Sequence, residues 1–284
     1  MQRQQPALAQ DRCIVLPFRS GSGGAFAGAG LALHFLLGNV LVLHPGLREC
    51  WFGWRVTRIF SAFDAFSRYC RAEGPDLDLQ EVSARQDIRF WVSGHCQPGR
   101  IEMQIFDARV PKSPVSADTA YSCADDLLGF RSAFLTCFGR SACPFPESRQ
   151  PAALWPEKVN PDGLEAVGAA LLEFYRFAFT GAEAPISLAL FHKAAASAPA
   201  SFMAQNLLGW ALYRDGQSAE AAAGFRRTLE INPNGAGAMA GLMWCALQDG
   251  DRESSVYWAG RKAEVCSQDV EAAREKARQR FEKT

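Results

Sequence analysis

The pattern of hydrophobic and polar positions along this chain changes near residue 150. Before that point, short apolar runs alternate with turns. Residues 12–18 predict a buried strand, 31–43 a helix, and 47–60 a strand rich in aromatic and β-branched residues. From residue 164 onward the pattern is helical and rich in alanine. We therefore expect two domains of different construction.

The first half continues with the clearest period-two pattern in the chain. Residues 88–96 and 101–108 alternate apolar and polar positions around a Pro-Gly turn, which predicts a β-hairpin. We expect helices at 77–86 and 123–138 and a loop at 111–120. Strands and helices in this order are typical of a small mixed α/β domain over 12–140, with a disordered segment at 1–11 and a proline-rich linker at 141–163.

A glycine-rich segment joins the first strand to the first helix. It fits neither the G-x-G-x-x-G pattern of dinucleotide sites nor the G-x-x-x-x-G-K pattern of phosphate loops. We expect a mobile loop containing Gly21, Gly23, Gly24, Gly28 and Gly30. The apolar stretch 25–43 is long enough to span a bilayer. Because it includes a histidine, an asparagine and several glycines, we interpret it as a buried helix of a soluble protein.

The second half repeats at a fixed period, with copies that begin at positions 168, 202 and 236. The best-preserved copy, 202–235, has its diagnostic residues at Leu208, Gly209, Gly216, Ala221, Phe225 and Pro233. With these residues it resembles a tetratricopeptide repeat, with degenerate copies at 168–201 and 236–269 and a charged cap helix at 270–283. The resemblance implies stacked helix pairs over 164–284, whose concave groove binds a peptide or another protein.

Aromatic and polar side chains share one face of the first helix of the middle repeat. The corresponding positions in the neighbouring copies lie one period away and hold an arginine and a second tryptophan. An alternative is that these side chains pack on neighbouring helices or on the α/β domain. The predicted partner-binding residues are Arg176, Met203, Asn206, Trp210, Tyr213, Arg214 and Trp244.

Five short motifs occur in order along the first half, at 15–18, 45–48, 92–94, 106–108 and 125–127. Together they resemble the α/β domain at the amino terminus of TolB-like proteins, although a glycine loop replaces the acidic loop of that family. The resemblance implies a bacterial signalling or regulatory context, and we expect no cyclase or winged-helix output module in this chain.

Composition narrows the class of protein without assigning chemistry. The chain has 284 residues, 48% of them apolar, and 30 basic side chains balance 30 acidic ones. This excludes collagen and long disordered tails and disfavours nucleic-acid binding over the whole surface. Nine scattered cysteines without a C-x-x-C motif indicate reduced thiols and a cytoplasmic location. We expect no metal, cofactor or membrane span.

The function expected from these patterns is that of a non-enzymatic adaptor that docks a partner segment in the groove of its repeats. An alternative is a regulatory subunit whose α/β domain binds a small molecule near the glycine loop. A weaker alternative is an enzyme that uses Cys50, His95 and Cys96, if folding brings them together.

Overall fold

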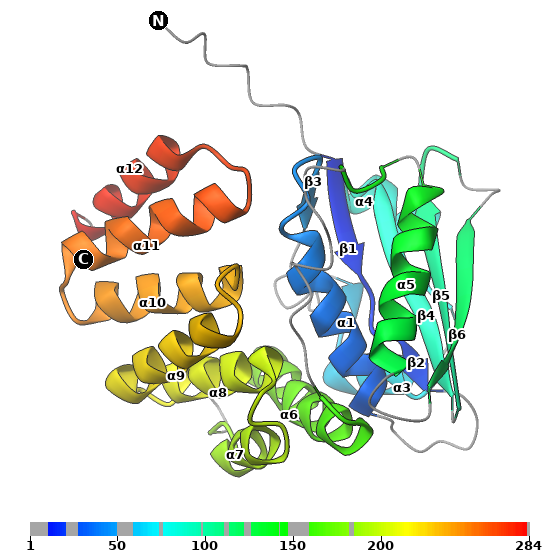
Figure 1. The fold of residues 1–284 in the computed structure, drawn as a ribbon, viewed down its shortest axis with the longest axis horizontal. Helices are drawn as coiled ribbons and strands as arrows, with labels where there is room; N and C mark the ends of the chain where they lie inside the picture. Colours follow the sequence, from blue (N-terminus) through cyan, green and yellow to red (C-terminus); the bar gives the residue numbers. More distant parts are fainter. Residues whose placement is uncertain are drawn as a thin grey trace, which may run out of the picture.

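The chain folds into a sheet and a curved array of helices, with one helix between them (Figure 1). The structure is a computed structural model, and the coarse expectation of an α/β part followed by an all-helical part is confirmed. It describes residues 11–20, 28–49, 59–73, 76–97, 99–110, 114–121, 126–141, 143–146, 159–181 and 185–282.

The sheet is mixed, with parallel strands at one edge and antiparallel strands at the other. Its order is β3-β1-β4-β5-β6, and the short β2 pairs with β4 beyond the end of β1. Pro17, which has no N–H to donate, lies in the interruption between β1 and β2. The strands are β1 (Asp11–Val15), β2 (Arg19–Ser20), β3 (Leu47–Glu49), β4 (Phe90–Gln97), β5 (Gly99–Asp107) and β6 (Val115–Tyr121).

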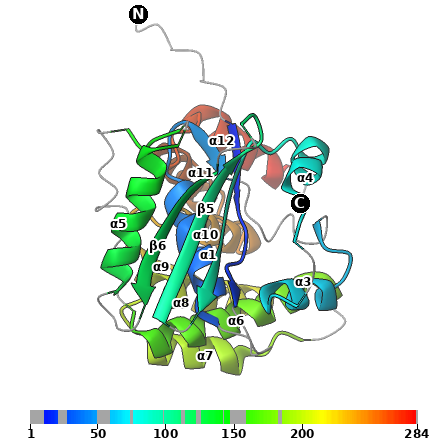
Figure 2. The same ribbon diagram turned by 90° about the vertical axis from the view of Figure 1, so that its right-hand side faces the viewer.

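One face of this sheet is the core face. In β5, Ile101, Met103 and Ile105 are buried, whereas the alternate residues are at least partly exposed, as the period-two pattern predicts. Two helices cover the core face, α1 (Gly28–Leu41) and α5 (Asp126–Gly139), and the opposite face is turned toward the viewer in Figure 2. Two further helices, α3 (Phe63–Cys70) and α4 (Leu79–Gln86), complete the α/β part.

Two sequence predictions in this half are wrong. Residues 115–121 form β6, not a loop, because an edge strand with the small inward residues Ala117 and Thr119 has little hydrophobic signal. Of the strand expected over 47–60, only the start is a strand, β3. Its last residue, Phe60, is not in a strand and lies just before α3. Residues 50–58 of that prediction lie outside the described residues. The hairpin of β4 and β5 is confirmed.

Helix α1 is the central element of the molecule. It is apolar around its circumference, and most of its residues are buried. A helix with this pattern must be covered on all sides. The sheet covers one side of α1, and the helices α6 (Pro161–Thr180) and α8 (Phe202–Arg214) cover the other. Among the described residues, no helix is both long enough and apolar enough to cross a bilayer.

Glycines let α1 and α6 approach to backbone contact. A Cβ atom on Gly168 would overlap the carbonyl oxygen of Gly28, and one on Gly28 would overlap that of Glu165. The Gly28 amide also donates to the Glu165 carboxylate at 2.5 Å. Gly28 and Gly30 therefore belong to a packed helix, and their assignment to a mobile loop is wrong. Gly21, Gly23 and Gly24 lie outside the described residues.

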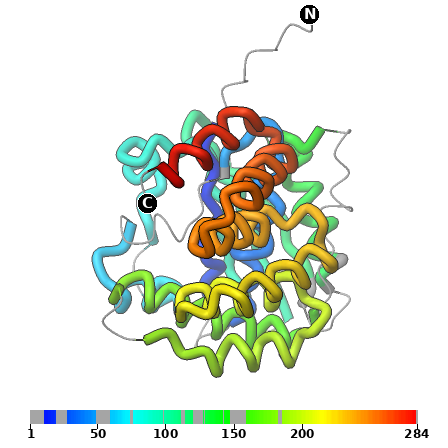
Figure 3. Tube along the Cα trace, turned by 90° about the vertical axis from the view of Figure 1, so that its left-hand side faces the viewer, coloured from blue at the N-terminus to red at the C-terminus, as the bar shows by residue number. Residues whose placement is uncertain are grey.

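The helical part consists of antiparallel pairs, of which two consecutive ones keep a fixed interval and the first, α6 and α7, does not (Figure 3). Besides α6 and α8, its helices are α7 (Leu188–Ser197), α9 (Ser218–Ile231), α10 (Ala236–Gln248), α11 (Arg252–Val265) and α12 (Val270–Phe281). The offset from the start of α8 to that of α10 equals the offset from α9 to α11, and both equal the period found in the sequence. Equivalent turns contain Gly216 and Gly250, both at positive φ.

Small residues make room for Phe225 between the pairs. Its ring fills the space where Gly209 of α8 and Gly241 of α10 have no side chain, and a Cβ on Gly209 would lie 2.7 Å from the ring. The two helices α8 and α10 therefore meet the buried Phe225 ring at positions that have no side chain of their own.

The first helix of this part begins earlier than expected. Asn160 caps α6 by accepting a hydrogen bond from the Gly163 amide, and Pro161 occupies the first turn, so the helix starts inside the predicted linker. One buried cluster runs from the sheet through α1 into α6, α7 and α8. The two-domain boundaries stay a prediction, and residues 147–158 of the linker lie outside the described residues.

The α1–α6 contact predicts a large effect of a single methyl group. Gly168→Ala should lower the free energy of unfolding by about 3 kcal/mol, the upper range for overpacking, because backbone atoms cannot move aside as a side chain can. Gly139→Ala in α5 is the matched control, since no atom lies near its added Cβ. Urea denaturation measures both. Equal stabilities of the two variants would contradict the contact.

Burial of His34 in α1 predicts acid sensitivity. Its Nε2 lies 2.6 Å from the Tyr175 hydroxyl of α6, and desolvation lowers its pKa from 6.5 to about 3. The unfolded chain therefore binds a proton in this window that the folded chain does not. Stability should fall as the pH drops below about 6.5, by up to about 1.4 kcal/mol per unit.

The His34→Gln variant tests this assignment. Glutamine can still hydrogen-bond to Tyr175 but does not titrate, so the slope of stability against pH should be shallower between pH 6 and about 4. His192→Gln, at an exposed position of α7, should keep the wild-type slope. Urea titrations at several pH values provide the measurement. A His34→Gln slope equal to that of wild type would show that this histidine is not the acid-sensitive group.

Candidate functional site

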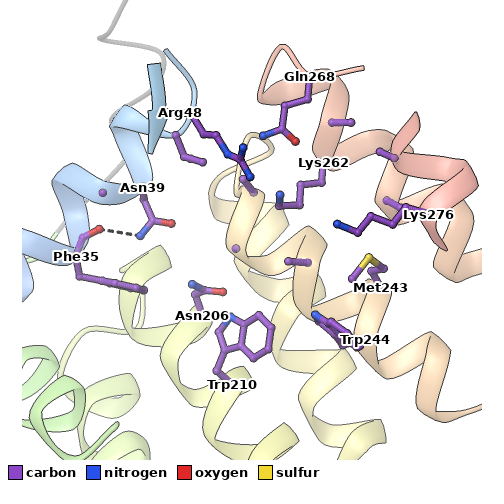
Figure 4. A pocket seen from close by; sticks show the side chains of 18 of the residues that line it. Phe35, Asn39, Arg48, Asn206, Trp210, Met243, Trp244, Lys262, Gln268 and Lys276 are labelled. Carbon is purple, nitrogen blue, oxygen red and sulfur yellow. Dashed lines mark hydrogen bonds between the residues drawn. The ribbon is translucent and has the colours of Figure 1, made fainter. Parts of the chain in front are cut away.

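A groove of about 570 Å³ lies between the α/β part and the last helices (Figure 4). Residues of β1, α1 and β3 form one wall, α8 and α10 form the floor, and α11 and α12 form the far wall. This volume is within the range of small-molecule sites, which occur often where two structural units meet.

Part of the concave face of the helical array is already covered. Helix α1 packs against α6 and α8, so their inner surfaces belong to the same buried cluster as α1. The open groove therefore begins at α8 and extends to α12. This is why the first predicted repeat contributes no residue to it among those that the structure describes.

Three predicted partner-binding residues come together in this groove: Asn206, Trp210 and Trp244. The other four lie elsewhere. Met203 is fully buried in the core, and Tyr213 packs edge-on against Trp210 without lining the groove. Arg214 is exposed outside the groove.

The fourth residue, Arg176, is held on α6. Its guanidinium forms an ion pair with Glu173 at 2.6 Å and donates to the Pro185 carbonyl. Arg176 therefore corresponds to Trp210 and Trp244 in the sequence repeat, but its side chain lies outside the groove.

Asn206 is a buried polar group without a partner. The residue is 3% exposed, and its Oδ1 has no hydrogen-bond partner in the described structure. Its amide packs against Gly237 of α10 at the groove floor. Buried polar atoms are almost always hydrogen-bonded, and leaving one unpaired costs about 1–3 kcal/mol. The Oδ1 atom is closed off from solvent, but the Asn206 side chain lines the groove floor, so rotation of its amide would let Oδ1 accept a hydrogen bond from a ligand.

The two tryptophans are positioned by different neighbours. The Trp210 ring lies 5.3 Å from Phe225, which itself is locked between two glycines, so its orientation follows from the packing of the helix pairs. The Arg280 guanidinium lies over the Trp244 ring at 4.7 Å. Both rings present partly exposed surface in the groove, and tryptophan is a common anchor in binding sites.

The charge of the groove has one sign. Among its described lining residues none is acidic, and the basic ones are Arg12, Arg48, Lys262, Lys276 and Arg280. The chain as a whole is neutral, so this is a local concentration of positive charge. A concave surface lined by one sign of charge focuses the electrostatic potential and attracts ions of the opposite sign.

Sequence reasoning missed these basic residues because they come from separate elements. Arg48 was noted only as part of the 45–48 motif, and Lys262 and Lys276 lie on different helices. No spacing along the chain connects β3 with α11 and α12; only the fold brings them to one groove. In the register of β1 and β3, Arg12 and Arg48 are cross-strand partners, a pairing visible only once the strands are aligned.

The cysteine and histidine alternative receives no geometric support among the described residues. Burial raises the pKa of the Cys96 thiol to about 12, which opposes its use as a thiolate nucleophile. His95 is its neighbour on β4, with its side chain on the opposite face, and Cys50 lies outside the described residues. No cluster of potential metal ligands occurs in the described part of the chain.

A second cysteine–histidine pair is also unsuited to nucleophilic chemistry. The Cys143 sulfur lies 4.0 Å from His44 Nε2, but burial raises the pKa of this thiol. His44 Nδ1 accepts the Gly46 amide, which leaves the proton on Nε2, facing the Pro144 carbonyl at 3.1 Å. The imidazole therefore has no free basic nitrogen for the thiol.

Comparison with protein-family models and with curated proteins finds no match that would assign a family. The groove is therefore interpreted from its own geometry and charge.

The unpaired Asn206 amide predicts that an apolar side chain at this position makes the fold more stable. Asn206→Leu should raise the free energy of unfolding by about 1 kcal/mol, because it removes an unpaired buried amide of similar size. Asn232→Leu is the matched control: Asn232 is equally buried, but its Oδ1 accepts the Asn234 amide, so its loss should destabilise. Urea denaturation compares them. A fall in stability for both variants would show that the Asn206 amide is satisfied.

Proposed function

We propose that this chain is a non-enzymatic interaction protein that docks a short segment of a partner protein in the groove between α8, α10 and α12. The proposal includes the tetratricopeptide character of the helical part and a regulatory or signalling role. The recurrence of helix pairs at the period of the sequence repeat supports the first of these.

The observation that carries the proposal is the composition of the groove floor. Trp210 and Trp244 are equivalent residues of consecutive repeats, so their rings lie on adjacent inner helices. Asn206 precedes Trp210 by one helical turn and offers an unpaired amide. An extended peptide needs this combination, because its side chains require apolar anchors and its backbone requires hydrogen-bond partners.

The extent of the groove limits the length of the segment. Since α1 covers the inner surfaces of α6 and α8, the docked chain does not run the full length of the helical array. A short segment or a chain end fits this volume, whereas a long helix does not.

A second candidate function is that of a ligand-binding regulatory subunit. The observation that favours it is the shared construction of the groove, in which β1, α1 and β3 supply one wall. In this candidate function the ligand would bind between the two parts of the chain, in the groove.

A displayed library of random peptides, selected on the full-length chain, tests the docking function. Trp244→Ala should weaken the selected peptides at least tenfold, the loss of about 1.4 kcal/mol or more expected for an aromatic anchor. Fluorescence anisotropy with labelled peptides measures the Kd.

Tyr257→Ala supplies the matched control. Tyr257 is an exposed aromatic residue of α11 outside the groove, so its removal should leave the Kd within about twofold. Peptides that bind wild type and Trp244→Ala equally well would place docking elsewhere. A library that yields no binders would reject the docking function.

A further inference from the structure

We propose that the groove also binds a small organic polyanion that bridges the two parts of the chain. Its charged end would be held by Arg48 from the α/β part and by Lys262 and Lys276 from the helical part. Its planar, hydrogen-bonding body would face Asn206 and Trp210 at the floor. This is the chemistry of a nucleoside polyphosphate. The inference goes beyond the docking function and does not depend on it.

Two lysines of the groove have no partner for their charge among the described residues. The ammonium groups of Lys262 on α11 and Lys276 on α12 make no hydrogen bond or ion pair in the described part of the chain. Acidic neighbours on the same helices are engaged elsewhere: Glu264 pairs with Arg261, and Glu275 with Arg278. Two uncompensated cations therefore face one groove (Figure 4).

The opposite wall of the groove also carries basic side chains. Arg12 and Arg48 are cross-strand partners of β1 and β3, so two more guanidinium groups come from the α/β part. Arg12 has a carboxylate partner in Asp87 at 3.5 Å, which lies outside the groove lining. An anion between Arg48 and the two lysines would be attracted from both walls.

The groove has a basic rim and a floor that carries tryptophan rings and the Asn206 amide. In Figure 4, Arg48, Lys262 and Lys276 lie at one end, whereas Trp210, Phe35 and Asn206 lie at the other. A free phosphate ion would use only the rim. A ligand with a ring would also contact the tryptophan and give the buried Asn206 amide its missing partner.

Binding of defined probes to the full-length chain tests the proposal. The probes are tripolyphosphate, which has the charge alone, ATP, which has the charge and a ring, and adenosine, which has the ring alone. Isothermal titration calorimetry in magnesium-free buffer gives each Kd, and thermal unfolding at constant ionic strength gives the stabilisation. We expect ATP to bind more tightly than tripolyphosphate and adenosine not to bind detectably.

Charge-reversal variants locate the site. Lys262→Glu and Lys276→Glu should each raise the Kd of ATP at least tenfold, whereas Lys193→Glu, an exposed lysine of α7, should change it less than about twofold. Lys262→Gln, with unfolding of each variant checked without ligand, separates loss of binding from loss of folding.

Failure of both polyanions to bind at millimolar concentration overturns the proposal, as does equal weakening by Lys193→Glu. Equal affinity for tripolyphosphate and ATP rejects the role of the floor. An unchanged Kd in Arg48→Glu rejects bridging of the two parts. The docking function is tested separately, with selected peptides and the Trp244→Ala variant, so failure of one proposal can be told from failure of the other.

Discussion

The rest of this structure depends on the contact between the backbones of α1 and α6. Gly28 and Gly168 bring the two helices together with no side chain between them, and the Glu165 carboxylate accepts a hydrogen bond from the first turn of α1. The sheet packs on one side of α1, and the helical array packs on the other. The position of the sheet relative to the last helices, and with it the groove, follows from this one crossing.

The same contact explains why α1 is so apolar. A helix with solvent on one side needs only an apolar stripe, but α1 has protein on nearly every side. His34 shows the consequence for polar groups in such a helix: it stays neutral because burial lowers its pKa, and it hydrogen-bonds to Tyr175 across the crossing. A segment that has the length of a membrane span in sequence is thus a central helix of the folded core.

Much of the fold could be predicted from local signals, and the site could be predicted only in part. The hairpin, α4 and the period of the helix pairs all leave repeating patterns, because each depends on residues near one another in the chain. Strand β6 leaves little pattern, since its inward residues are small.

Among the residues of the candidate site, Asn206, Trp210 and Trp244 could be predicted from the helical period. Met203 follows the same period but points into the core, because α1 covers that part of the inner face. Arg48, Lys262 and Lys276 meet only through tertiary structure.

The glycine crossing also has a consequence for selectivity. Contacts between flexible side chains allow two packed units to slide or rotate by small steps, whereas backbone atoms in contact leave no such freedom. The crossing therefore fixes how the α/β wall of the groove is held against the start of the helical array. A molecule that binds in the groove as proposed would meet this wall in a single position and would have to match it in shape.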